Sequence, residues 1–98
     1  MTFNDEEQLK RILIRFRADS LNDSGEIQEA MLQNDQTQLR LLMHRVAGRI
    51  AQIGSKKLSS EFRLMEMQLA SEGLDEHKKY SINTLLKQLD LLLTQLKK

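Results

Sequence analysis

Apolar residues recur every three or four positions in four successive segments of the chain, and a short polar or glycine-containing stretch follows each of the first three. This spacing places the apolar side chains on one face of an α-helix, and such a face is stable when it packs against another element. No proline interrupts the segments. Four amphipathic helices joined by short turns predict an all-α fold, arranged as an antiparallel up-down-up-down four-helix bundle. The 98 residues suffice for one modest core, so we expect a single domain over residues 1–98.

The first predicted helix runs from about Asp5 to Leu32. Polar residues and a glycine interrupt its apolar spacing over residues 19–25. Either one helix, with a bend, or two helices that meet near residues 22–25 fit this pattern, and we favour one helix. The expected core positions of the whole segment are Leu9, Ile12, Leu13, Phe16, Ile27, Ala30 and Met31.

Glycines and capping residues bound the later helices. The second helix is predicted from about Gln36 to Ile53, and glycines at positions 54 and 73 end the second and third helices. Ser55 is a candidate N-cap of the third helix, and Asp75 is a candidate N-cap of the last helix, which continues to Lys97. The expected core positions of these three helices are Leu39, Leu42, Met43, Val46, Ile50, Ile53, Leu58, Phe62, Met65, Met67, Leu69, Ile82, Leu85, Leu86, Leu89, Leu92, Leu93 and Leu96.

Charge and composition argue against several classes of partner. Fifteen basic and 14 acidic residues are mixed along the chain and give a net charge of +1, so there is no basic block of the kind that binds nucleic acid. No apolar run approaches the length of a membrane span, and we expect no direct membrane contact and a cytoplasmic location. The chain has no cysteine, and its two histidines are far apart in sequence, so we predict no metal site.

His44 has unusually small neighbours on the second helix. On a helical wheel its side chain points away from the apolar stripe, which covers about 100° of the opposite face. Ala47, Gly48 and Ala51 lie within about 60° of His44, where long charged side chains are usual on an exposed helix face. A glycine inside a helix is about 1 kcal/mol less favourable than alanine. We therefore expect that a partner must approach the imidazole closely.

The imidazole of His44 is suited to nucleophilic chemistry. With an ordinary pKa of about 6.5, it is mostly neutral above pH 7 and has a lone pair that can attack an acyl phosphate without a separate base. No serine or cysteine is placed for a catalytic triad, and a convex helix face offers no oxyanion pocket. We therefore expect no autonomous kinase or hydrolase site, and a partner that supplies the electrophile. The alternative is a surface histidine without a chemical role, which is our interpretation of His77.

His44, Gly48, Gly54 and Leu58 are spaced as in histidine-containing phosphotransfer domains, and the preceding helix pair is also similar, so the chain resembles this family from about residue 9 to residue 96. The resemblance implies that His44 accepts a phosphoryl group from an aspartyl-phosphate of a response-regulator receiver domain and passes it to another receiver. It implies a monomer, free-standing or the C-terminal module of a hybrid sensor kinase. The chain would need no cofactor of its own, because the Mg²⁺ belongs to the receiver.

The sequence departs from the family at Ala47, where the family often has a lysine that stabilises the phosphoryl group. Arg40, Arg45 or Lys56 could supply this charge, and we favour Arg45 because a guanidinium binds phosphate well. The expected receiver-docking residues around His44 are Leu41, Ala47, Gly48, Ala51 and Ser55. The missing lysine also leaves an alternative open, namely a non-catalytic helical protein-interaction or dimerisation module.

Overall fold

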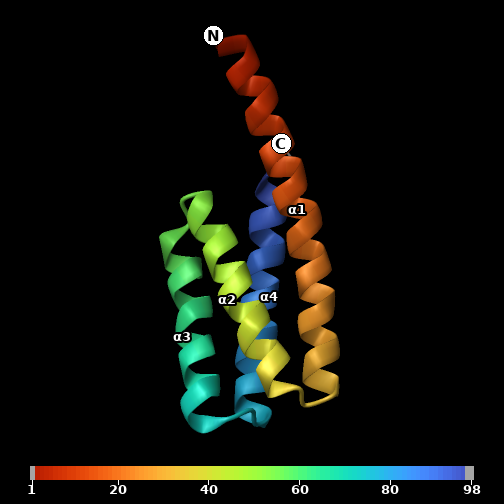
Figure 1. The fold of residues 1–98 in the computed structure, drawn as a ribbon, viewed down its shortest axis with the longest axis vertical. Coiled ribbons are helices and arrows are strands. Elements are labelled where there is room, and N and C mark those ends of the chain that lie inside the picture. The colour runs from red at the N-terminus through yellow and green to blue at the C-terminus, as the bar shows by residue number, and fades with distance from the viewer. Residues whose placement is uncertain (1, 97–98) are drawn as a thin grey trace.

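The structure, a computed structural model, describes the backbone of residues 2–96 and the side chains of residues 7–95. Four α-helices account for nearly all of this range. They are α1 (Thr2–Leu32), α2 (Gln36–Gln52), α3 (Lys56–Glu72) and α4 (Glu76–Leu96), with no strand in this range. The predicted all-α fold is therefore confirmed. The helices lie side by side, and the N-terminal part of α1 extends beyond the others (Figure 1). The predicted end of the last helix at Lys97 lies outside the described residues.

Capping residues and glycines form the turns between the helices. The carboxylate of Asp35 accepts a hydrogen bond from the backbone N–H of Gln38 at 3.1 Å, which caps α2. Gly54 and Gly73 have φ values of +90° and +79°, in the left-handed region that glycine adopts without strain. Ser55 occupies the N-cap position of α3, but its side chain makes no capping hydrogen bond.

Asp75 and Lys78 hold the start of α4 to the end of α3. The carboxylate of Asp75 accepts a hydrogen bond from the backbone N–H of Lys78 at 2.8 Å, and this bond, with the Lys78 ammonium, lowers the pKa of Asp75. The Lys78 side chain is buried, and its Nζ lies 3.0 Å from Glu72 Oε1 and 3.0 Å from Asp75 Oδ2. The hydrogen bonds to Glu72 and Asp75 raise the pKa of Lys78.

The core is formed by side chains from all four helices. α2 lies against α1 and α3, and α4 lies against α1 and α3. Most of the core positions predicted for the last three helices are buried, with Ile53 and Leu92 half-buried at the edge. The side chain of Leu96, another predicted core position, lies outside the described residues. Met67 is an exception, because its side chain is 66% exposed. Across residues 2–96, every helix falls short of the length and apolar content that a bilayer crossing requires.

α1 is one continuous helix through residues 22–25, so the one-helix interpretation is confirmed. Its predicted core is only partly correct. Phe16 is buried, whereas Leu9 and Ile12 are 55% and 57% exposed and Leu13 is half-buried. The physical reason is length, because this part of α1 passes beyond the ends of α2 and α3 (Figure 1). Periodicity identifies the apolar face of a helix but not how far its neighbours extend along it.

Candidate functional site

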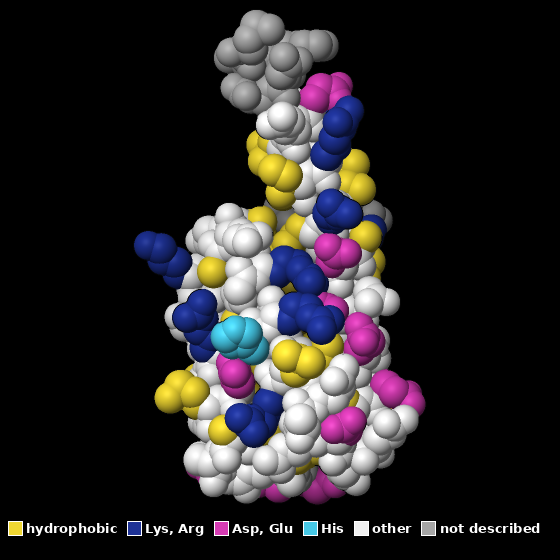
Figure 2. Space-filling view, viewed as in Figure 1, with side chains coloured by type: hydrophobic (Ala, Val, Ile, Leu, Met, Phe, Trp, Pro, Cys, Tyr) yellow, Lys and Arg dark blue, Asp and Glu magenta, His cyan; other side chains and the backbone are white. Residues whose placement is uncertain are grey.

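His44 is an exposed residue of α2 whose ring is held by a carboxylate from α3. Its side chain is 71% exposed, and its Nδ1 lies 3.2 Å from Oε1 of Glu66. Because an ionised carboxylate can only accept a hydrogen bond, Nδ1 is the donor here, and the lone pair of the neutral ring is then on Nε2. Figure 2 shows a histidine on this face with acidic and basic side chains around it. Most of the His44 side chain therefore faces solvent.

A shallow hollow of about 280 Å³ lies beside the imidazole, between α2 and α3. Arg40 and His44 line it from α2, and α3 contributes Arg63, Glu66 and Met67, together with Ala70. Met67 is therefore part of this surface and not of the core, which explains its exposure. The hollow brings two guanidinium groups and one carboxylate to the same side of the molecule as the histidine.

Gly48 has open space where a side chain would be. A Cβ built on Gly48 meets no atom of the surrounding structure within 4 Å, so the packing of α2 does not require a glycine there. Gly25 in α1 is equally open, and what distinguishes Gly48 is its position one helical turn after His44. The helix penalty at Gly48 is therefore not offset by close packing against the described residues.

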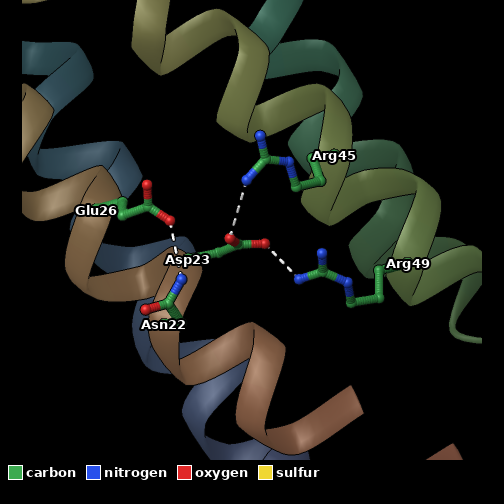
Figure 3. Close-up of polar contacts among 5 residues, drawn as sticks. All are labelled: Asn22, Asp23, Glu26, Arg45 and Arg49. Carbon is green, nitrogen blue, oxygen red and sulfur yellow. Dashed lines mark hydrogen bonds and ion pairs between the residues drawn. The ribbon is translucent and has the colours of Figure 1, made fainter. Parts of the chain in front are cut away.

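Arg45, the favoured phosphoryl-supporting residue, faces α1 (Figure 3). Its Nη1 lies 3.4 Å from Oδ1 of Asp23, and Arg49 forms a second ion pair with the other oxygen of the same carboxylate. Asp23 is 2% exposed, so one buried anion is shared by two cations. Asn22 donates a hydrogen bond to Glu26 at 3.0 Å beside this cluster. In the sequence, this part of α1 is visible only as an interruption of the apolar spacing.

Lys56 is the first residue of α3 and does not line the hollow. It lies about 15 Å along the helix axis from Glu66, the residue that contacts His44. Of the three predicted supporting residues, only Arg40 lines this hollow together with the imidazole. Arg63 and Glu66 were missed by the sequence analysis. The helical period groups them on one face of α3, but only the register of α3 against α2 shows that this face meets His44.

The predicted docking residues divide into an exposed group and one buried residue. Leu41 is 52% exposed, Ala51 is exposed, and Gly48 and Ser55 are partly exposed. The prediction that Ala47 shares this exposed face is wrong, because its side chain is 1% exposed. α3 covers this position, and the hydroxyl of Ser59 donates a hydrogen bond to the Ala47 carbonyl at 2.8 Å. A small residue at position 47 lets the two helices approach each other.

Comparison with known proteins gives no match to a protein-family model, to a curated protein or to a solved structure. In the part of the chain that the structure describes, no three His, Asp or Glu side chains gather where they could hold a metal ion. His77, the other histidine, is exposed on α4. Any function assigned to this chain therefore depends on its own residues and their geometry.

Proposed function

We propose that this chain is a histidine-containing phosphotransfer domain, folded as a single antiparallel up-down-up-down bundle. His44 accepts a phosphoryl group from an aspartyl-phosphate of a response-regulator receiver domain and passes it to another receiver. The observation that carries this proposal is the exposed His44, held through Nδ1 by Glu66, with the open Gly48 one turn away. The order of helix contacts and the course of the chain in Figure 1 support the bundle arrangement.

The geometry suits a reversible transfer. The Nε2 lone pair of His44 attacks the phosphorus, the N–P bond forms, and the P–O bond to the receiver aspartate breaks with its electron pair leaving on that carboxylate. The proton stays on Nδ1, which donates a hydrogen bond to Glu66, and the negative charge of Glu66 stabilises the cationic ring. The same steps in reverse deliver the phosphoryl group to a second aspartate. Mg²⁺ and the acidic residues that position the phosphoryl group belong to the receiver.

The test is transfer from a receiver carrying a labelled aspartyl-phosphate, with His44→Gln as the inactive variant. His77→Gln is the matched control, because it removes the only other histidine, which is exposed on a different helix. We expect acid-labile, alkali-stable label on the wild type and on His77→Gln, and none on His44→Gln. Label that never reaches the wild type, or that still reaches His44→Gln, would contradict the proposal.

The exposed apolar face of α1 favours one alternative, a helical dimerisation module without covalent chemistry. By helical spacing, Leu9 and Ile12 share a face of α1 with the buried Phe16, but their side chains are exposed. In this alternative a second copy covers the face. Sedimentation that depends on protein concentration in the wild type, but not in a Leu9→Ser, Ile12→Ser variant, would support it. A monomer at all concentrations is the result that the phosphotransfer proposal predicts.

A further inference from the structure

We infer that Arg40 and Arg63 form a two-sided binding site for the phosphoryl group carried by Nε2 of His44. This inference rests on the proposed function and extends it. In many members of the family a lysine at the position of Ala47 stabilises the phosphoryl group. Here one arginine from each of two neighbouring helices takes this role. From the sequence alone, Arg45 is the favoured residue for this role, and no local pattern points to Arg63.

The first support is the shape of the surface. Arg40 precedes His44 by one turn of α2, so their Cβ atoms are about 6 Å apart on the same face. Arg63 precedes Glu66 by one turn of α3, and Glu66 contacts the imidazole directly. Both arginines and the imidazole line the same hollow, Arg40 from α2 and Arg63 from α3.

The second support is the availability of charge. Arg45 and Arg49 are already paired with Asp23. Among the residues that the structure describes, no carboxylate lies within ion-pair distance of Arg40 or Arg63. Both side chains are exposed, so they can reorient at little cost. A guanidinium offers paired N–H donors that match two phosphate oxygens, and it remains charged at every physiological pH.

The third support is the position of Glu66 in the same hollow. Nδ1 and Nε2 lie on opposite sides of the imidazole ring, so a phosphoryl group on Nε2 is directed away from the carboxylate that binds Nδ1. A phosphoryl dianion near Glu66 nevertheless experiences like-charge repulsion, which two adjacent cations offset. The site therefore holds its anion between Arg40 and Arg63 while Glu66 fixes the ring.

The test loads His44 without a receiver. Phosphoramidate transfers its phosphoryl group to Nε2, the donor P–N bond breaks and ammonia leaves. The second pKa of the bound phosphoryl group is then measured by ³¹P NMR in the wild type, in Arg40→Gln, in Arg63→Gln and in the double variant. Arg11→Gln, which removes an exposed arginine far along α1, is the matched control for net charge. Arg45→Gln tests the rival assignment.

We expect the phosphoryl pKa of the double variant to be about one unit higher than that of the wild type, with each single variant between them, because a nearby cation favours the dianion. Arg11→Gln should leave it unchanged. A double variant with the pKa of the wild type, an Arg45→Gln shift as large as that of Arg63→Gln, or no labelling of His44 in the wild type would overturn the inference. Because no receiver is used, the measured phosphoryl pKa does not depend on whether a receiver transfers its phosphoryl group to His44. Conversely, an unchanged pKa in the arginine variants would contradict the binding site but not the proposed transfer through His44.

Discussion

The replacement of Gly48 separates a folding role from a functional one. Gly48 lies inside α2, and an added Cβ would meet no atom within 4 Å. Gly48→Ala should therefore stabilise the protein by about 0.5–1 kcal/mol, the helix penalty of glycine relative to alanine. For a domain of this size, 1 kcal/mol corresponds to a rise in Tm of about 4–8 °C. Urea unfolding followed by far-UV circular dichroism measures the free energy.

Gly48→Gln tests whether the open space at Gly48 is needed for phosphoryl transfer. Glutamine also favours the helix, so the free energy of unfolding should not fall. Its side chain occupies the space beside His44, and it should slow transfer from a phosphorylated receiver at least tenfold. A tenfold decrease corresponds to an activation free energy that is higher by about 1.4 kcal/mol. Gly25→Gln is the matched control, because Gly25 is an equally open helical glycine far from His44 in sequence. A loss of stability in Gly48→Ala, or unchanged transfer in Gly48→Gln, would refute the reasoning.

Three further predictions concern the fold. Asp23→Asn should lower the free energy of unfolding by about 2 kcal/mol, less than for a fully buried pair because the two arginines remain 43% and 21% exposed. Asp75→Asn should have a lower free energy of unfolding than the wild type above about pH 4, because the pKa of Asp75 is lowered in the folded protein. This difference should vanish as the pH falls through the lowered pKa, and urea unfolding at a series of pH values measures it. Leu9→Ser should cost less than about 0.5 kcal/mol, since the side chain is 55% exposed, whereas Phe16→Ala should cost about 3 kcal/mol or more.

These predictions have distinct controls. Asp19→Asn removes an exposed carboxylate from the same helix as Asp23 and should be nearly neutral. An equal loss in both variants would show that the buried ion pairs contribute nothing. For Asp75, a stability difference that persists unchanged below pH 2 would contradict the assigned pKa direction. If Leu9→Ser and Phe16→Ala were equally destabilising, the N-terminal part of α1 would be packed in solution.

The ends of the helices were predictable because the residues that end or cap a helix act on neighbours in the sequence. Gly54, Gly73 and Asp75 act through backbone geometry and hydrogen bonds to residues within a few positions, and they lie at the turns as expected. The apolar stripe of α3 was equally clear, because its heptad-like spacing needs no knowledge of the partner helix. The exposure of Leu9 was not predictable, since it depends on where other helices end.

The candidate site could be predicted only in part, because only some of its residues belong to one helix. His44 and Gly48 belong to one helix, so a helical wheel places them correctly relative to each other. The wheel does not give the position of the neighbouring helix, and for this reason Ala47 was assigned to the exposed face although α3 covers it. Glu66 is 22 positions from its histidine partner, and contacts at such distances depend on the register of α3 against α2.

The central claim is that Nε2 of His44 carries a phosphoryl group, and NMR of the protein labelled with ¹⁵N and phosphorylated by its receiver tests this most directly. Nitrogen–phosphorus coupling identifies the phosphorylated residue and the bonded ring nitrogen together. The account predicts coupling to Nε2 of His44, with Nδ1 still hydrogen-bonded to Glu66. Coupling to Nδ1 of His44, coupling to His77, or no phosphohistidine in the presence of a competent receiver would contradict it.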